Sequence, residues 1–458
     1  MTDRRPGVLA ALGRPKVAQM LALGFSSGLP FMLIGNTLGY WLAQDHVRLA
    51  AIGFVSWIGL TYGVKFVYGA VVDRLPAPLV GRLGRRRGWM LLAQIGVAAG
   101  LLGMAASDPV RHFGWLVATG LFTGVCAATQ DTVQDALRIE MAADADELSL
   151  LTSANSIGFR VALLATEAWI FGLANLIGWP ASYQVFAGLM IVGPIATLLV
   201  KEPARADAVM AAKAAETRRH PVLGAWDAVA GPISAFVRAH GPAAAILMLA
   251  LITTYHLSDF MRGPMVNPSY LAFRIPMLTI MGVRTTIGIA ASFAGIALGG
   301  LSAARLGIRT TLIIGALVQP VAVAAFALLG WHGGDWTVFS LGPLPVTAFE
   351  LVMAFDGLAM AYAGVGLAVY MSTLTSLGYT ATQYALLTSA LVWFGKFLKG
   401  WSGAIVERLG HGQNLPAAYA EFYLLAAAVG APAIILSLVV ARSGLRPDQA
   451  AALVADRN

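Results

Sequence analysis

The chain has 458 residues, of which 58% are hydrophobic and only 12% are charged, whereas about a quarter of residues are charged in soluble proteins. Mean hydropathy is +0.73, and apolar stretches long enough to cross a hydrocarbon core of about 30 Å as a helix recur throughout the chain. These values exclude a soluble protein and predict an all-α integral membrane protein. The net charge of +8 is explained by Lys and Arg in cytoplasmic loops, so we expect no nucleic-acid partner.

About twelve membrane-spanning helices are predicted from the hydropathy. In chain order they lie at 17–43, 49–72, 88–106, 113–140, 149–177, 179–200, 242–271, 276–302, 309–331, 344–375, 381–408 and 416–441. Several of these stretches exceed what a helix perpendicular to the membrane needs, which favours tilted helices.

Basic residues collect in alternate loops, and this fixes the expected orientation. Lys and Arg are frequent before the first span and after the second, sixth, eighth and last spans, and scarce in the other loops. By the positive-inside rule both termini are cytoplasmic. We therefore predict a cytoplasmic N-terminus (1–16), a six-helix half (17–200), a cytoplasmic linker (201–240), a second six-helix half (241–442) and a cytoplasmic tail (443–458).

The fourth span carries charges at membrane depth, in "GLFTGVCAATQDTVQDALRIEMA" (120–142). Asp131, Asp135 and Arg138 are spaced i, i+4 and i+7, so they form one stripe of a helix, which also includes Gln134. Lipid cannot solvate such a stripe, so it must face a water-filled cavity or a partner helix. Glu140 lies off the stripe near the cytoplasmic end, and we expect it to be solvated.

Two basic residues are candidate partners for these carboxylates. Lys65 lies within the second span and Arg160 within the fifth, where it reaches a depth similar to that of Asp131. Two carboxylates one turn apart are not both easily ionised in a poorly solvated site, so the pair is suited to taking up and releasing a proton. The alternative is a static ion-pair network that only holds the first half together.

The second half has its own polar residues. His256 and Asp259 share a helix face in "TTYHLSDFMRGPMVNPSY" (253–270), where Gly263, Pro264 and Pro268 are expected to break the seventh span. Asp356 lies inside the tenth span and Lys396 inside the eleventh, and we expect these two to pair across helices. Tyr255, Trp393 and Asn36 are further candidates to face a solute.

Several stretches together identify a family. They are "LGFSSGLPFMLIGNTLGYWL" (23–42), "VVDRLP" (71–76), "GRRRGWMLLAQ" (84–94), "ATQDTVQDALRIE" (128–140), "YHLSDFMRGPMVNPSYL" (255–271), "YTATQYALLTSAL" (379–391) and "GKFLKGWSG" (395–403). In both halves and in this order, they resemble the AmpG-type muropeptide permeases of the major facilitator superfamily. In that fold two six-helix halves rock around a site near the membrane midplane.

The resemblance implies proton-driven import of N-acetylglucosaminyl-anhydro-muramyl peptides from periplasm to cytoplasm during cell-wall recycling, with an indirect link to beta-lactamase induction. It implies a location in the bacterial cytoplasmic (inner) membrane. Its motifs contribute Lys65, Asp131, Asp135, Arg138, Asp259, Asp356 and Lys396.

The predicted site combines these residues with those selected above. Proton-coupling candidates are Asp131, Asp135, Asp259 and Asp356; substrate or charge-partner candidates are Lys65, Arg138, Arg160, His256, Tyr255, Asn36, Trp393 and Lys396. A conformational-switch loop after the second span comprises Gly69, Asp73, Arg74, Arg85 and Arg86. The chain has no phosphate-binding loop, metal-ligand spacing or nucleophile elbow, so we expect a monomeric transporter, not an enzyme, with no cofactor or metal.

Two alternatives stay open at this point. One is a transporter of the same fold for another solute, such as a siderophore, peptide, drug or acyl-CoA, because fold does not fix substrate. The other, from a different class, is a membrane enzyme or a sensor that transports nothing.

Overall fold

The structure is a computed structural model. It describes residues 15–64, 72, 77–78, 80–142, 145–201, 234, 236–238, 240–341, 344–374, 387, 392, 394–410 and 414–442. These residues form two compact units: unit 1 comprises the described residues of 1–47 and 58–219, and unit 2 those of 48–57 and 220–458. The predicted linker at 201–240 and the tail at 443–458 lie almost entirely outside the described residues.

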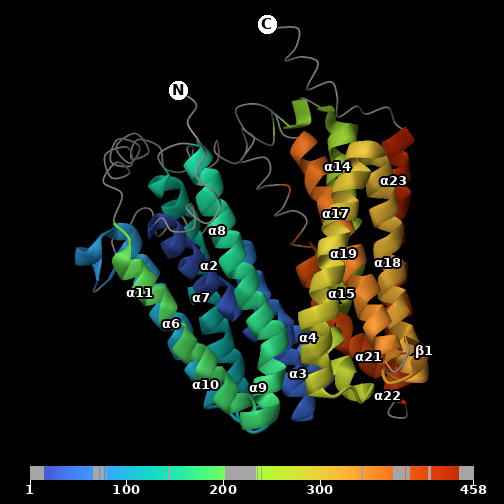
Figure 1. Cartoon of the computed structure of the whole chain (residues 1–458), viewed down its shortest axis with the longest axis horizontal. Helices are drawn as coiled ribbons and strands as arrows, with labels where there is room; N and C mark the ends of the chain where they lie inside the picture. The colour runs from blue at the N-terminus through green and yellow to red at the C-terminus, as the bar shows by residue number, and fades with distance from the viewer. Residues whose placement is uncertain are drawn as a thin grey trace, which may run out of the picture. The chain divides into compact units, whose positions relative to one another are not determined.

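In the described part of unit 1 the regular elements are all helices (Figure 1). Its elements are α2 (Pro15–Leu33), α3 (Asn36–Gln44), η1 (Ser56–Val64, in unit 1 from Ile58), η2 (Gly81–Leu83), α6 (Arg85–Ala105), α7 (Phe113–Met141), α8 (Ala145–Leu164), the π-helical turn η3 (Ala165–Trp169), α9 (Ile170–Ile177), α10 (Trp179–Leu189) and α11 (Val192–Leu199).

Glycines allow α2 and α8 to pack with their backbones in contact. A methyl group on Gly24 would collide with the Asn155 carbonyl, and one on Gly28 would lie 2.8 Å from the Phe159 carbonyl oxygen. Gly158 faces the Leu21 carbonyl in the same way. This is the small-residue packing typical of membrane helices. The stretch "GFSSG" is therefore a packing motif within α2, which ends at Leu33, and α3 continues the same span from Asn36.

The described part of unit 2 contains helices and one short hairpin. Its elements are α4 (Leu49–Val55), α14 (Pro242–Tyr255), α15 (Leu257–Ala272), α16 (Met277–Val283), the π-helical turn η4 (Arg284–Gly288), α17 (Ile289–Arg305), α18 (Ile308–His332), β1 (Thr337–Leu341), β2 (Leu344–Thr347), α19 (Ala348–Thr373), η5 (Lys399–Trp401), α21 (Ser402–Gly410), α22 (Leu415–Ala428) and α23 (Ala431–Arg442).

The hairpin corrects the predicted start of the tenth span. Strands β1 and β2 pair antiparallel, and the helix begins at Ala348, four residues after the predicted 344. A capping box fixes this start: Thr347 accepts a hydrogen bond from the Glu350 backbone N–H, and the Glu350 carboxylate accepts one from that of Thr347. Such caps satisfy backbone groups that the helix itself leaves unpaired.

The seventh span breaks at a different place from the one predicted. Pro264 and Pro268 lie inside the continuous helix α15, and the interruption falls at His256, between α14 and α15. The prolines therefore do not open the chain where we expected free backbone groups.

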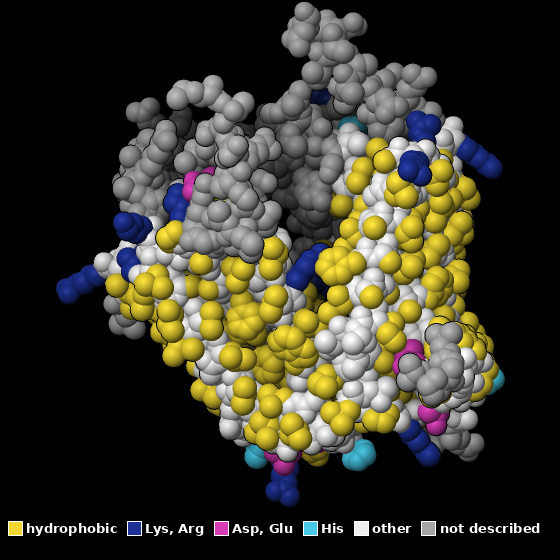
Figure 2. Space-filling view, viewed as in Figure 1, with side chains coloured by type: hydrophobic (Ala, Val, Ile, Leu, Met, Phe, Trp, Pro, Cys, Tyr) yellow, Lys and Arg dark blue, Asp and Glu magenta, His cyan; other side chains and the backbone are white. Residues whose placement is uncertain are grey.

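The helices have the length and apolar character of membrane spans. Among the described residues, ten helices are long and apolar enough to cross a membrane, and Leu49–Gly63 forms a shorter apolar one. In Figure 2 hydrophobic side chains cover the sides of each unit, while charged side chains lie mostly towards the helix ends. The total of twelve spans and the orientation stay predictions.

Candidate functional site

The charged stripe of α7 lies half-buried in unit 1. Asp131 accepts a hydrogen bond of 3.1 Å from the Ser27 hydroxyl of α2. Asp135 forms an ion pair of 3.0 Å with Arg138 one turn along α7, with side-chain exposures of 47% and 18% respectively. These carboxylates are therefore accessible to a proton or a solute yet held by neighbouring polar groups.

A second, fully buried row of amides runs beside the stripe. Gln130 donates to the Ser26 hydroxyl at 3.0 Å, and Gln134 donates to Asn155 of α8. Gln134 therefore belongs to the packing between helices and not to the accessible stripe. Because these amide and hydroxyl groups do not ionise, their contacts hold α7 against α2 and α8 whatever the protonation of the carboxylates.

Glu140 departs from its predicted role. It is not simply solvated, since it pairs with Arg86 of α6: Arg86 Nη2 lies 2.6 Å from Glu140 Oε1, and Arg86 Nε contacts both carboxylate oxygens at 3.2 Å. The Arg86 side chain is only 5% exposed. A fork-like Arg–carboxylate pair of this kind is geometrically specific, so it fixes the start of α6 to the end of α7.

The remaining unit 1 candidates divide into two groups. Arg160 is exposed on α8, Asn36 is half-buried in the first turn of α3, and Arg85 begins α6. Four other predicted residues of unit 1 lie outside the described part of the chain: Lys65, Gly69, Asp73 and Arg74. Trp393 of the second half lies outside it as well.

Unit 2 centres on a buried arginine that the sequence analysis did not select. Arg262 Nη2 lies 2.7 Å from Asp259 Oδ1 and 2.9 Å from Asp356 Oδ1. Its guanidinium carbon also lies 5.1 Å from the centroid of the Phe326 ring. The side-chain exposures of Arg262, Asp259 and Asp356 are 6%, 24% and 14%. Of the three, Asp259 is the most accessible from outside the cluster.

A second arginine lies beside this cluster. Arg284 opens the π-helical turn η4 and donates to Asn267 Oδ1 at 2.6 Å. Its guanidinium carbon also lies 5.4 Å from the centroid of the Tyr270 ring. Arg284 is half-buried, whereas Asn267 is 1% exposed. π-helical turns are rare and are frequently found at functional sites, which marks Arg284 as a candidate binding residue.

Other predicted residues of unit 2 have different neighbours from those expected. The ion pair that the structure shows for Asp356 is with Arg262 of α15; Lys396 is half-buried, and its pairing with Asp356 stays a prediction. His256 contacts Gln319 at 2.7 Å. Tyr255 is 2% exposed and donates to the Leu312 carbonyl at 2.9 Å, so it packs between helices here, and its contact with a solute stays a prediction.

Two signals could have revealed the missed arginines. Arg262 follows Asp259 by three residues, which places both on one helix face, and Arg284 is an isolated charge in the predicted span 276–302. Intramembrane arginines are expensive and usually functional. Among the described residues, no three His, Cys, Asp or Glu side chains are grouped to hold a metal ion.

Comparison with known proteins places the chain in a family. Residues 20–361 match the profile of the Major Facilitator Superfamily. The anhydromuropeptide permease of Escherichia coli K12 is 30% identical over 429 residues, covering 93% of this chain and 80% of that protein. The chain is an AmpG-type permease of the major facilitator superfamily. The putative transporter AmpG 3 of Rickettsia prowazekii is 26% identical, covering 81% of this chain and 84% of that protein.

Solved structures confirm the fold of the permease. The nucleoside transporter NupG has a TM-score of 0.65 at 16% identity, covering 93% of this chain and 99% of that one. A peptide transporter POT, solved with sulfate, has a TM-score of 0.64 at 12% identity and covers 97% of each chain. Together with its AmpG relatives and its apolar helices, this makes the permease a multi-pass protein of the bacterial inner membrane with the major facilitator fold.

Proposed function

We propose that this permease imports anhydro-muropeptides from periplasm to cytoplasm by proton symport, as part of cell-wall recycling and with an indirect link to beta-lactamase induction. The observation that carries the proposal is the 30% identity to an anhydromuropeptide permease across 93% of the chain. The buried charges of both units support it, because a proton-coupled carrier needs groups that exchange protons.

Arg262 and Arg284 are suited to a solute that carries carboxylates, as the peptide of a muropeptide does. A guanidinium binds a carboxylate through parallel hydrogen bonds. Arg262 is already neutralised by Asp259 and Asp356, so it is freed for a solute only when one of them takes up a proton. Asp259 is the more exposed of the two. Protonation of Asp259 would thereby couple proton uptake to substrate binding.

Asp131 and Asp135 are the second candidate for coupling. Asp131 is held by an uncharged hydroxyl, which can donate to an ionised carboxylate and accept from a protonated one. Asp131 can therefore change protonation without losing its contact to α2. The static ion-pair network remains the competing explanation for this stripe.

Uptake by proteoliposomes tests the proposal. We expect the wild type to accumulate labelled N-acetylglucosaminyl-anhydro-muramyl peptide when a proton gradient is imposed. Asp131→Asn, Asp135→Asn and Asp259→Asn are compared with Asp108→Asn, a control in the loop before α7. A coupling residue is one whose variant loses gradient-driven uptake but retains solute exchange.

Each part of the proposal has its own contrary result. Wild-type uptake that is unchanged when the proton gradient is collapsed refutes proton coupling. The absence of any uptake refutes the proposed muropeptide substrate. Another carboxylate-bearing solute, such as a peptide, is the second candidate, because the arginine pair does not depend on the sugars. Competition of unlabelled peptide against labelled muropeptide separates the two.

A further inference from the structure

The hairpin formed by β1 and β2 exposes apolar side chains. Val338 is 42% exposed and Phe339 is 45% exposed, and Trp336, directly before β1, is 42% exposed. The stretch 336–349, which includes the hairpin, contains no charged residue. A two-stranded hairpin alone is at best marginally stable in water, so we expect a further apolar surface to cover these side chains.

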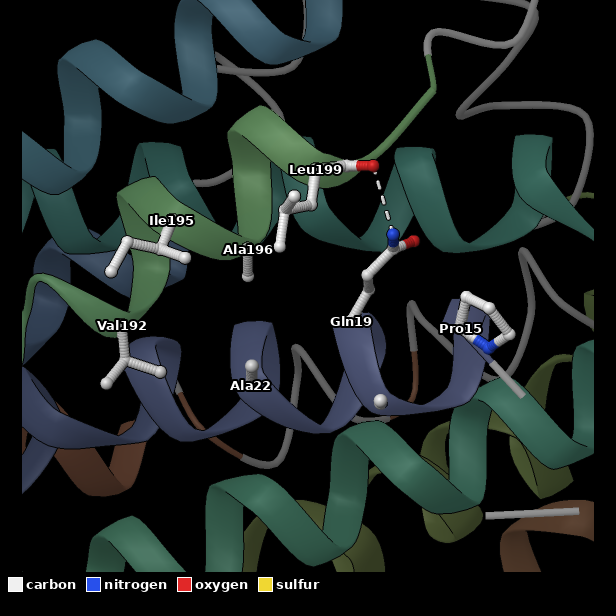
Figure 3. Close-up of a pocket in the computed structure, with 8 residues that line it drawn as sticks. Pro15, Gln19, Ala22, Val192, Ile195, Ala196 and Leu199 are labelled. Atoms are coloured by element: carbon white, nitrogen blue, oxygen red, sulfur yellow. Dashed lines mark hydrogen bonds between the residues drawn. The ribbon is translucent and has the colours of Figure 1, made fainter. Parts of the chain in front are cut away.

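On the spanning helices, exposed apolar side chains are explained by the bilayer. Ile195 and Leu199 of α11, which Figure 3 shows as sticks, are 52% and 64% exposed. They belong to a stretch long and apolar enough to cross the membrane, where lipid chains replace water. The hairpin is not part of a spanning helix, so what covers it must be argued from its position.

Helix α18 places the hairpin along the membrane normal. The helix is continuous from Ile308 to His332, and no charged residue lies between Arg309 and His332. At about 1.5 Å per residue this uncharged stretch is about 33 Å long, close to the hydrocarbon thickness of about 30 Å. The His332 end of α18 therefore lies where hydrocarbon meets headgroups, and β1 begins within a few residues of it (Figure 1).

One exposed apolar stripe of α18 leads to the hairpin. Its members are Leu317, Val321, Leu328 and Trp331, with exposures of 44%, 56%, 39% and 54%. Their spacing of i, i+4, i+11 and i+14 puts them on one face of the helix. Because α18 is long and apolar enough to span the membrane, this face meets lipid. Trp side chains are enriched at the boundary between hydrocarbon and water, and Trp331 lies at that end of the stripe.

Contacts at its base hold the hairpin beside the ends of α18 and α19. The Trp336 ring lies 4.6 Å from the ring of His332, measured between centroids. The Trp336 carbonyl accepts a hydrogen bond of 2.8 Å from the Ala348 N–H, and the Gly334 carbonyl accepts one of 3.3 Å from the Phe349 N–H. The lipid-facing surface of α18 is therefore continuous with the exposed side chains of the hairpin.

We propose that the β1–β2 hairpin lies in the membrane interface at this end of α18, with Trp336, Val338 and Phe339 among the headgroups and the adjoining acyl chains. The partner is the bilayer surface and not one bound lipid, because the hairpin offers no charged residue to select a headgroup. The hairpin anchors the ends of α18 and α19 at one depth. This inference is independent of the transported solute.

Spin-label accessibility in liposomes tests this assignment. Cys126, the single cysteine of the chain, is replaced by Ser, and a nitroxide is attached to Val338→Cys. Dioxygen concentrates in hydrocarbon and a polar nickel chelate stays in water, so the ratio of their collision rates with the label reports depth. We expect this ratio to be several-fold higher than for Val110→Cys, an exposed valine in the loop beside Asp108. Leu328→Cys on α18 gives the hydrocarbon reference.

Each outcome decides the proposal. A ratio for Val338→Cys no higher than for Val110→Cys would put the hairpin in water and overturn it. A label that neither reagent reaches would show that protein covers the hairpin, such as a second copy of the chain, and would also overturn it.

A second pair of variants tests the apolar side chain itself. In the Val338→Cys background, Phe339→Asp should lower the ratio, because a carboxylate is costly to remove from water, whereas Phe339→Leu should retain it. Circular dichroism that matches the parent protein shows that each variant is folded. Equal ratios for the two folded variants would count against the interface.

Discussion

The ion pairs of Arg262 with Asp259 and Asp356 give the sharpest test of how much paired buried charges contribute to the stability of unit 2. At 2.9 Å from Asp356 Oδ1, the attraction between the two charges is about 6 kcal/mol at an effective dielectric constant of about 20. Desolvation of both groups offsets part of it, so Arg262→Met should lower the free energy of unfolding by about 3 kcal/mol, chiefly because two carboxylates lose their counterion.

A double-mutant cycle separates this effect from lost packing. Asp356→Asn alone should lower the free energy of unfolding by about 2 kcal/mol. The double variant should lower it by about 3 kcal/mol, because it removes the arginine charge and the Asp356 charge at the same time. The coupling energy of about 2 kcal/mol would exceed the average of about 0.6 kcal/mol for side-chain hydrogen bonds between membrane helices.

The assay is unfolding in mixed micelles, titrated with dodecyl sulfate and followed by circular dichroism. Arg305→Met, an exposed arginine at the end of α17, is the control for loss of a positive charge. Strict additivity of the two single variants would refute the reasoning, because it would mean that Arg262 and Asp356 do not stabilise one another.

Three further predictions concern packing, the α6–α7 ion pair and pH. Gly295→Ala should lower the unfolding free energy by about 1–3 kcal/mol, because the added methyl collides with the Leu358 carbonyl. Gly300→Ala on the same helix is the control: its methyl meets no atom within 4 Å, so it should be neutral or stabilising in the same titration. Glu140→Gln should lower the free energy of unfolding by about 3 kcal/mol, because it removes the carboxylate charge that lies 2.6 Å from Nη2 of the buried Arg86. A loss under about 1 kcal/mol, typical of exposed pairs, would contradict it. Backbone N–H groups of Arg111 and Val110 lower the pKa of Asp108, so the stability that this carboxylate adds to the folded protein is present above the ordinary Asp pKa of about 3.9 and is lost as pH falls through the lower folded value. The thermal midpoints of Asp108→Asn and wild type should therefore differ at neutral pH and converge near pH 2. A difference that persists near pH 2 would argue against this account.

The spans could be predicted from the sequence because hydropathy and helix periodicity are local properties. The predicted 242–271 and 416–441 correspond to Pro242–Ala272 and Leu415–Arg442 in the structure. The i, i+4, i+7 spacing likewise placed Asp131, Asp135 and Arg138 together on α7, and the structure keeps Asp135 and Arg138 paired.

The partners between helices were decided only by the tertiary structure. Asp356 pairs with Arg262, 94 residues away in the sequence, and Glu140 with Arg86, 54 residues away. Such pairings depend on the rotation and depth of each helix, which small residues such as Gly24 set by allowing backbones to touch. A single sequence records which charges are present, but the packing of the helices determines which of them meet.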